Sequence, residues 1–223
     1  MQKLIFTKES YPLENLQDVA MDNTMKTYGM ILAAGLSSRM GFYKPLAEIH
    51  HKPMICWTID SMKNGGVEKI IIVTGHNRNL LMKEVRKRYG HEVEFVFNHE
   101  YETGNMFDSV LAGLPYMRDA DAFYLLLADM PAVLPETFRL LKEKMIETKK
   151  EIIIPVMNGR RKHPPLVSAK LIDNILCYAG RDGLRGFWKQ EEARILHVEV
   201  NDRGCGMDAD TPDALDSLRK YLS

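Results

Sequence analysis

The chain has 223 residues, enough for one domain with a sizeable core, and its 30 basic residues balance 30 acidic ones. A formal net charge of zero gives no overall field that would draw the protein to nucleic acid or a membrane surface, and no apolar stretch approaches the roughly 20 residues of a membrane span. Three scattered cysteines without metal-ligand spacing suit a reducing compartment. We therefore expect a cytoplasmic protein with small-molecule partners, no nucleic acid and no membrane.

The regular elements begin after residue 27. Residues 1–27 are mixed and polar and keep no sustained period, so we expect an N-terminal extension or arm, followed by one domain over residues 28–223. In this domain, apolar runs alternate with amphipathic segments. The expected strands are 28–34, 68–75, 93–98, 122–129, 151–156 and 194–200. The expected helices are 53–66, 79–90, 105–117, 135–147 and 208–222, with shorter helical stretches in 168–180 and 183–192.

Apolar strands that alternate with helices indicate an α/β fold with three layers, α/β/α, in which a mostly parallel sheet is covered on both faces. Ligands of such sheets bind beyond the carboxyl ends of the strands. The segments that follow Ala34, Val73, Asn98 and Leu127 are therefore the first places to look for a site.

The loop GLSSRMGFYK, from Gly35 to Lys44, follows the first expected strand. Gly35 lets the backbone turn sharply and expose its N–H groups, while Ser37, Arg39 and Lys44 add donors and positive charge. Such a loop can cradle an anion. It lacks both the Gly-Lys-Ser/Thr ending of a Walker A loop and the glycine spacing of a dinucleotide fingerprint. A tight turn with solvated charges is the alternative.

Two acidic segments could hold a metal ion. LLLADMP puts Asp129 at the carboxyl end of an apolar strand, where a carboxylate is costly without a partner. Magnesium is one candidate partner, and capping of the next helix is the alternative role. In GMDADTPDAL, Asp210 or Thr211 suits the N-cap of the last helix, which leaves Asp208 as the freer carboxylate. Asp129 and Asp208 could therefore hold one magnesium ion between them.

Two further loops carry polar groups whose roles stay open. Gly104 and Asn105 precede a helix, where backbone N–H groups and an amide either read a base edge or cap the helix. NGRRKHPPL contains Arg160, Arg161 and His163, which form either a second anion patch or a solvated basic turn.

Several of these segments together resemble a known family. MILAAGLSSRMGFYKP, residues 30–45, is similar to the LAAGxSxRMGxxK motif of the MobA-like nucleotidyltransferases. TGNMFDSVLAGL, LLLADMP, NGRRKHPPLVS, GRDGLRGF and VNDRGCGMDADTPDAL follow in the order found in molybdenum cofactor cytidylyltransferases, the branch that joins CMP from CTP to molybdopterin. The resemblance covers residues 28–223. It implies a Rossmann-like, GT-A-like nucleotidyltransferase fold and an Mg²⁺-dependent transfer that releases pyrophosphate.

The resemblance also implies roles for individual residues. The nucleotide would be bound by Ala33, Ala34, Gly35, Ser37, Arg39, Lys44, Gly104 and Asn105. Catalysis would depend on Lys44, Arg39 and Asp129, and Mg²⁺ would be held by Asp129 and Asp208. The residues that would face the pterin acceptor are Arg160, Arg161, His163, Asp182, Gly183 and Arg185.

The match also bears on the choice of substrates. Guanylyl-transferring relatives usually carry Gly-Gly at the positions of Ala34 and Gly35, so Ala-Gly favours CTP over GTP. In the acceptor segment, Lys162 replaces the usual glycine and Pro165 a non-proline residue, which leaves the shape of the acceptor pocket open. KPLAEIHHKPMI resembles sugar-phosphate nucleotidyltransferases, with His51 in place of a glycine, so a sugar phosphate or other small phosphate is an alternative acceptor. A non-catalytic nucleotide- or pterin-binding module is a further alternative. The family also implies a transient complex with a molybdoenzyme.

Overall fold

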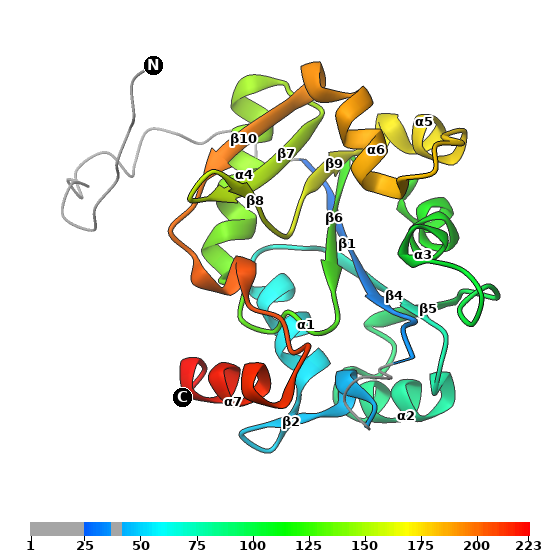
Figure 1. The fold of residues 1–223 in the computed structure, drawn as a ribbon, viewed down its shortest axis with the longest axis vertical. Coiled ribbons are helices and arrows are strands. Elements are labelled where there is room, and N and C mark those ends of the chain that lie inside the picture. The colour runs from blue at the N-terminus through cyan, green and yellow to red at the C-terminus, as the bar shows by residue number, and fades with distance from the viewer. Residues whose placement is uncertain (1–24, 37–41) are drawn as a thin grey trace.

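The computed structural model describes residues 25–36 and 42–223, and one large sheet forms its centre (Figure 1). The strand order is β10-β7-β9-β6-β1-β4-β5, and β8 pairs with β7. The strands are β1 (Thr27–Ala33), β4 (Lys69–Thr74), β5 (Val93–Phe97), β6 (Ala122–Leu127), β7 (Ile152–Met157), β8 (Arg160–Arg161), β9 (Leu166–Ser168) and β10 (Ile195–Glu199). A separate hairpin is formed by β2 (Glu48–Ile49) and β3 (Lys52–Pro53).

The strand pairing is mostly parallel, as expected. β1 is parallel to β4 and β6, β4 is parallel to β5, and β10 is parallel to β7. β9 is antiparallel to β6 and β7, and β8 is antiparallel to β7. All six expected strands form, whereas β8 and β9 arise in a segment that carries no strand pattern. Because β6, β1, β4 and β5 are parallel neighbours, their carboxyl ends meet at one edge of the sheet.

The helices also match the expected pattern, although residues 114–117 form a 3₁₀ turn at the end of the expected helix 105–117, the last helix begins at Pro212, and two further segments differ. They are α1 (Met54–Asn64), α2 (Arg78–Tyr89), α3 (Met106–Gly113), α4 (Pro135–Thr148), α5 (Ile172–Leu176), α6 (Gly183–Gln190) and α7 (Pro212–Tyr221). The stretch 168–180 is helical only in a short 3₁₀ turn, η4 (Ala169–Leu171), and in α5, because its first residue pairs in β9. Pro53 belongs to β3 and is the N-cap of α1 rather than part of its first turn.

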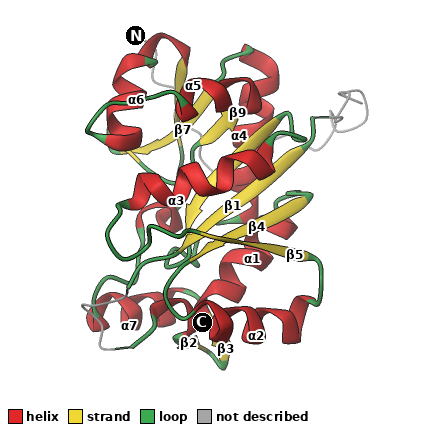
Figure 2. Cartoon of the chain, turned by 90° about the vertical axis from the view of Figure 1, so that its right-hand side faces the viewer, coloured by secondary structure: helices red, strands yellow, loops and turns green. Residues whose placement is uncertain are grey.

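Helices cover both faces of the sheet, and Figure 2 shows the strands between them. Successive side chains of a strand point to opposite faces. In β1, Ile31 and Ala33 join a core with α1, α2 and α4, while Met30 and Leu32 join a core with α3, α5 and α6. The three-layer α/β/α architecture is thereby confirmed.

A third, smaller core lies under α7. Leu215 and Leu218 of this helix are buried with Ile49 of the β2–β3 hairpin. The side chain of Thr211 accepts a hydrogen bond from the third residue after it, so Thr211 is the N-cap of α7 and Asp210 is not.

The buried carboxylate of Asp202 joins the loop after β6 to the loop after β10. Its Oδ2 accepts hydrogen bonds from the backbone of Leu134 at 2.9 Å and from Thr137 Oγ1 at 2.7 Å, while its Oδ1 accepts one from the backbone of Gly204 at 2.9 Å. A buried carboxylate is tolerated when its lone pairs are bonded in this way. At Gly204 a Cβ would collide with the carbonyl group of Ala132, so only glycine lets the two loops approach this closely. The loops that carry the two expected magnesium ligands are thus held together.

Residues 1–24, which make up most of the expected arm, lie outside the described residues. The first strand begins at Thr27, one residue before the expected domain boundary. Within the described ranges, the helices are too short or too polar to cross a membrane.

Candidate active site

A cavity of about 390 Å³ opens at the carboxyl edge of the sheet, between the loops that follow β1, β5 and β6. Most of the residues expected to contact the nucleotide line it. They are Ala33, Ala34, Gly35, Lys44, Gly104 and Asn105, together with the expected metal ligand Asp129. Ser37 and Arg39 lie outside the described residues. Loops from distant parts of the chain meet here because β6, β1, β4 and β5 are parallel neighbours.

The backbone at the end of β1 is held on two sides and open on a third. Tyr43 Oη donates a hydrogen bond to the carbonyl oxygen of Ala33 at 3.1 Å. The backbone N–H of His76 donates one to the carbonyl oxygen of Ala34 at 3.4 Å. A Cβ added at Gly35 would meet no atom of residues 25–36 and 42–223 within 4 Å. These residues therefore leave space at Gly35 for a ligand to approach the backbone closely, as an anion cradle requires.

Lys44 connects two carboxylates. It begins the 3₁₀ turn η2 (Lys44–Leu46), and its Nζ lies 3.3 Å from Asp129 Oδ2 and 2.6 Å from Asp210 Oδ1. Burial alone would lower the pKa of Lys44, but hydrogen bonds and charge from Asp210 and Asp129 outweigh it and raise the pKa above its ordinary value. Lys44 is therefore a fixed cation at the wall of the cavity.

Asp129 follows β6 and is a mostly buried carboxylate. Its Oδ1 is buried and has no hydrogen-bond partner among the described residues. Burial raises the pKa of Asp129, Lys44 lowers it in part, and the charges of Asp208 and Asp210 raise it further. The two expected metal ligands are thus close enough to repel each other, and a cation would relieve both this repulsion and the unpaired oxygen.

The chemistry of this donor set suits magnesium. Mg²⁺ commonly binds one or two carboxylates and completes its octahedral shell with water and substrate phosphates. In residues 25–36 and 42–223, no group of three or more His, Cys, Asp or Glu side chains is arranged to hold a metal ion. An ion bound by Asp129 and Asp208 would therefore take its further ligands from water and from the substrate.

Asn105 is the N-cap of α3. Its Oδ1 accepts a hydrogen bond from the backbone of Phe107 at 2.7 Å, and Asp108 Oδ2 accepts one from the backbone of Asn105 at 2.6 Å, which completes a capping box. The capping role is confirmed. The amide Nδ2 of Asn105 has no partner in the described part of the chain, so its role toward a base stays a prediction.

A buried pair at this edge was not expected from the sequence. Asn98, just after β5, donates through Nδ2 to Ser109 Oγ of α3 at 3.0 Å and accepts through Oδ1 from the backbone of Glu100 at 2.9 Å. Both side chains line the cavity, as does Tyr101. The place of Asn98 at the end of a strand was visible in the sequence, but Ser109 becomes its partner only when α3 docks on the sheet.

His163 is the acceptor residue that lies near the carboxylates. Burial lowers the pKa of His163, while a backbone hydrogen bond at Leu125 and the charges of Asp129 and Asp208 oppose this change. Its Nδ1 is buried without a hydrogen-bond partner in the described ranges. The imidazole is therefore neutral and placed close to the acidic pair.

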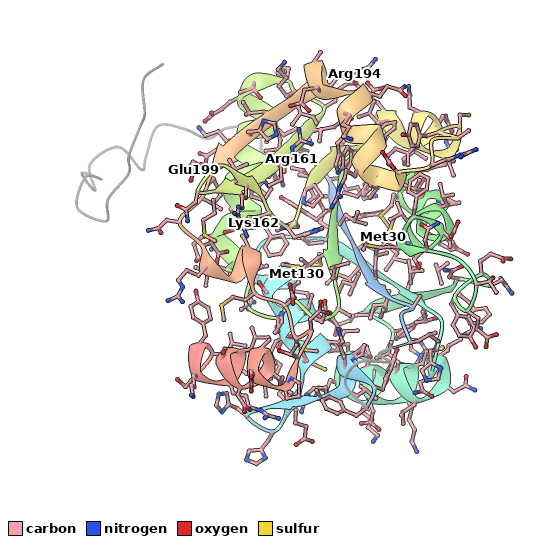
Figure 3. All side chains as sticks on the ribbon, viewed as in Figure 1. Met30, Met130, Arg161, Lys162, Arg194 and Glu199 are labelled. Atoms are coloured by element: carbon pink, nitrogen blue, oxygen red, sulfur yellow. The ribbon has the colours of Figure 1, made fainter. Side chains whose placement is uncertain are left out.

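The two arginines of the acceptor segment form β8. Figure 3 shows Arg161 beside β8 and β10. Arg161 Nε donates to His197 Nε2 at 2.9 Å, and its guanidinium pairs with Glu192. Arg160 is exposed on the same short strand. Their role toward the acceptor stays a prediction, and Arg161 would have to leave these partners to fulfil it.

The remaining acceptor residues stand at the start of α6. Gly183 has a φ of +53°, and a Cβ there would lie 3.2 Å from the Cβ of Phe107 in α3. Asp182 is exposed with its carboxylate 3.9 Å from Lys189 Nζ, and Arg185 is exposed nearby. Because Phe107 follows the Asn105 cap, this loop adjoins the rim of the nucleotide cavity.

Known proteins show similarity over most of the chain. A family model described as a MobA-like NTP transferase domain matches residues 29–195. The molybdenum cofactor cytidylyltransferase of Escherichia coli (strain K12) is 28% identical over 191 residues, which are 82% of this chain and 91% of that protein. The bifunctional protein GlmU of Thermosipho melanesiensis is 31% identical over 133 residues, 58% of this chain, and the match spans only 27% of GlmU.

Solved structures share the fold. Rv0371c from Mycobacterium tuberculosis H37Rv superposes with a TM-score of 0.71 at 23% identity, covering 88% of this chain and 98% of that one. The same protein in a complex with manganese gives a TM-score of 0.64 at 22% identity, with 88% and 99% covered.

Proposed function

The chain belongs to the family of MobA-like NTP transferase domains, and from this premise we propose that it joins CMP from CTP to the phosphate of a molybdopterin-type acceptor and releases pyrophosphate. The observation that carries the proposal is the Lys44–Asp129 pair in the wall of the cavity at the carboxyl edge of the sheet. Similarity to the cytidylyltransferase over 82% of the chain supports the choice of acceptor. The Ala34–Gly35 pair supports CTP as the donor.

The reaction is a substitution at the α-phosphorus of CTP. An oxygen of the acceptor's phosphate forms a new P–O bond there, while the bond to the bridging oxygen breaks and pyrophosphate leaves with that electron pair. A phosphate monoester has a second pKa of about 6, so the attacking oxygen is largely ionised at neutral pH and no side chain has to remove a proton. Catalysis is then mainly alignment and neutralisation of charge.

The nucleotide side of the site supplies both alignment and neutralisation of charge. The open backbone at Gly35 accommodates the phosphates, and the ammonium of Lys44, together with Arg39, binds their oxygens. Asp129 and Asp208 would hold Mg²⁺, which supplies further positive charge to the phosphate oxygens when it is bound. The Oδ1 of Asp129, which has no partner among the described residues, supports this assignment, as does the manganese complex of a protein with the same fold.

The acceptor side is proposed to lie between His163 and the start of α6. His163 is close to the carboxylates, and the loop with Asp182, Gly183 and Arg185 adjoins α3 at the rim of the cavity. A phosphate held between these two places would lie beside the nucleotide.

Pyrophosphate release, measured with each nucleotide and acceptor, tests the proposal. CTP with molybdopterin and Mg²⁺ should give turnover, and GTP or ATP should give much less. Lys44→Ala and Asp129→Ala should each lower kcat by roughly 100-fold or more, the scale found when one preorganised electrostatic contact is removed. Circular dichroism would confirm that both variants are folded. Asp213→Ala, in the first turn of α7, is the matched control and should keep full turnover.

Other outcomes would contradict individual parts of the proposal. Near-normal turnover in either variant would remove that residue from the mechanism, and use of GTP alone would overturn the base assignment. Preference for a sugar phosphate would change the acceptor. Nucleotide binding without turnover on any acceptor would favour a binding module, although the presence of Lys44, Asp129 and Asp208 argues against one.

A further inference from the structure

Asp210 has no part in the proposed mechanism, yet it contacts Lys44 more closely than Asp129 does. The distance to Lys44 Nζ is 2.6 Å from Asp210 Oδ1 and 3.3 Å from Asp129 Oδ2. The side chain of Lys44 is 13% exposed and that of Asp210 is 51% exposed. The ammonium group is thus held between an inner and an outer carboxylate.

The backbone on both sides of Asp210 is fixed. The N–H of Ala209 donates a hydrogen bond to the carbonyl oxygen of Asp129 at 3.1 Å, and Ala209 is completely buried. On the other side, Thr211 caps α7. The main chain on both sides of Asp210 is therefore fixed relative to Asp129.

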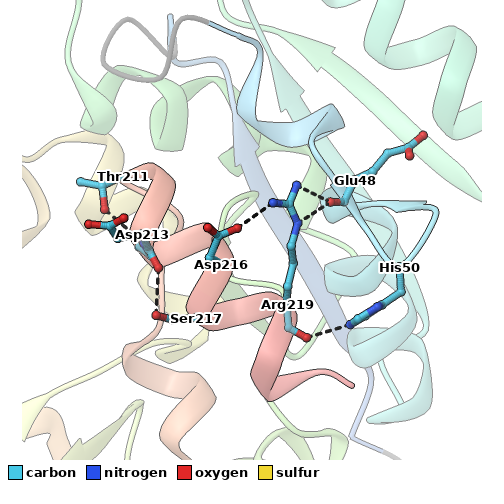
Figure 4. A network of polar contacts seen from close by, with 8 residues as sticks. Glu48, His50, Thr211, Asp213, Asp216, Ser217 and Arg219 are labelled. Atoms are coloured by element: carbon cyan, nitrogen blue, oxygen red, sulfur yellow. Dashed lines mark hydrogen bonds and ion pairs between the residues drawn. The ribbon is translucent and has the colours of Figure 1, made fainter.

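The helix that follows Asp210 docks next to Lys44. Figure 4 shows Arg219 of α7 reaching Glu48, and its Nε and one terminal nitrogen donate to the Glu48 carbonyl oxygen at 3.2 and 3.1 Å. His50 closes the contact through a ring nitrogen 2.7 Å from the Arg219 carbonyl oxygen. Glu48 and His50 lie in the hairpin that follows η2, so the segments that carry Lys44 and Asp210 are parts of one interface.

We propose that Asp210 is a positioning residue that holds the Lys44 ammonium against Asp129, at the cavity wall where the nucleotide phosphates bind. A lysine carries its charge on a flexible four-carbon stem, and much of its rotamer freedom is lost when the charge is fixed. A charge that is already in place stabilises the transition state without reorganisation during the reaction. The role rests on the proposed nucleotidyl transfer.

Turnover and CTP binding of Asp210 variants distinguish a positioning role from a structural role or a metal-binding role. Asp210→Ala should lower kcat by about 10- to 100-fold, the range expected when a catalytic group is misplaced. Asp210→Asn keeps an oxygen acceptor of the same shape and should recover part of the loss. The Kd for CTP, measured by calorimetry, should change much less than kcat, because the lost repulsion between Asp210 and the triphosphate offsets the weaker hold on Lys44. Asp213→Asn, on the same helix, is the control and should match the wild type.

Three results would overturn the proposal. The first is an unchanged kcat in Asp210→Ala. The second is a joint loss of kcat, CTP affinity and melting temperature, which would indicate a structural role. The third is a large rise in the Mg²⁺ concentration needed for half-maximal rate, which would make Asp210 a metal ligand.

A double-mutant cycle tests the contact independently of turnover. Unfolding by denaturant is compared in the wild type, Lys44→Ala, Asp210→Ala and the double variant, without nucleotide or metal. We expect effects that are not additive, since the two side chains are direct partners. Additive effects would overturn the Asp210 proposal alone. A wild type that releases no pyrophosphate with any acceptor would instead overturn the proposed function.

Discussion

At the scale of single residues, Asp129 combines a negative charge with a buried oxygen that no residue in 25–36 or 42–223 hydrogen-bonds. Burial raises the pKa of Asp129 despite the neighbouring Lys44, so the folded protein disfavours the ionised form relative to the unfolded chain. Asp129→Asn removes the charge at nearly the same shape, and Lys44 keeps Asp210 as a partner. We therefore predict a higher melting temperature for this variant than for the wild type near neutral pH in EDTA.

Added Mg²⁺ should reverse that order, because only the wild type gains a bound ion. Thermal unfolding monitored by circular dichroism, with and without Mg²⁺, gives the melting temperatures of the wild type and Asp129→Asn under both conditions. Asp213→Asn controls for the loss of one negative charge from the surface. A lower melting temperature for Asp129→Asn in EDTA would show that the buried charge stabilises the fold.

A second prediction at the scale of residues concerns His163 and the dependence of the free energy of unfolding on pH. Burial lowers the pKa of His163 below its ordinary value of 6.5. Above this value the ring is neutral in both states. As the pH falls below it, the unfolded chain binds the proton first, so the free energy of unfolding decreases until the folded pKa is reached. The stability associated with neutral His163 is thus present above about pH 6.5 and lost on acidification.

His163→Gln should therefore lose less stability than the wild type between about pH 7 and pH 5. Urea unfolding across this range gives the slope for each protein. His91→Gln, at an exposed position, should retain the wild-type slope. Equal slopes for His163→Gln and the wild type would contradict the prediction.

At the scale of elements, α3 connects stability with nucleotide binding through its cap. Asn105→Ala removes the side-chain cap and should lower the free energy of unfolding by about 1 kcal/mol. Serine caps helices about as well as asparagine but has no amide, so Asn105→Ser should keep the stability. If Nδ2 contacts the nucleotide, as the family resemblance implies, both variants should bind CTP more weakly.

Calorimetry with CTP and denaturant unfolding separate the two roles of Asn105. Weaker binding in Asn105→Ser, at unchanged stability, is the expected result. Full CTP affinity in that variant would leave Asn105 as a helix cap only.

The same scale shows why most elements could be predicted and the short strands β2, β3, β8 and β9 could not. β1, β4 and β6 are central parallel strands that are covered on both faces, and such strands appear in a sequence as continuous apolar runs. β8 consists of two arginines, and β9 has three residues that follow Pro164 and Pro165. These strands form because β6 and β7 leave unpaired edges next to them, which is a property of the assembled sheet.

At the scale of the whole molecule, the candidate site also has some features that could be predicted from the sequence and others that could not. The positions of Lys44 and Asp129 at the carboxyl edge of the sheet could be predicted, because each lies in a distinctive local pattern after a recognisable strand. The contact between Lys44 and Asp210 joins residues 166 positions apart and depends on the docking of α7. Because Asp210 stands next to Thr211 and Pro212, its local sequence predicts a helix cap. That pattern does not predict the contact of Asp210 with the distant Lys44.

Because the cavity joins the loops that follow β1, β5 and β6, ligand binding should stabilise the whole fold. A ligand at 100 times its Kd adds about 2.7 kcal/mol to the free energy of unfolding. For a domain of this size, we predict that CTP with Mg²⁺ raises the melting temperature by about 5–10 °C. GTP at the same concentration should give a smaller shift.

Differential scanning fluorimetry measures these shifts without an acceptor, which makes it a test of the nucleotide site alone. EDTA should reduce the CTP shift, because a metal-free triphosphate would add its charge to the carboxylates of Asp129 and Asp208 without a cation between them. Lys44→Ala should reduce it too, while Asp213→Ala should not. An equal or larger shift with GTP would assign the cavity to guanine, and an undiminished CTP shift in Lys44→Ala would place the phosphates elsewhere. Lys44 contacts both Asp129 and Asp210, so its loss should disturb the wall of the cavity as well as remove a charge that binds the phosphates.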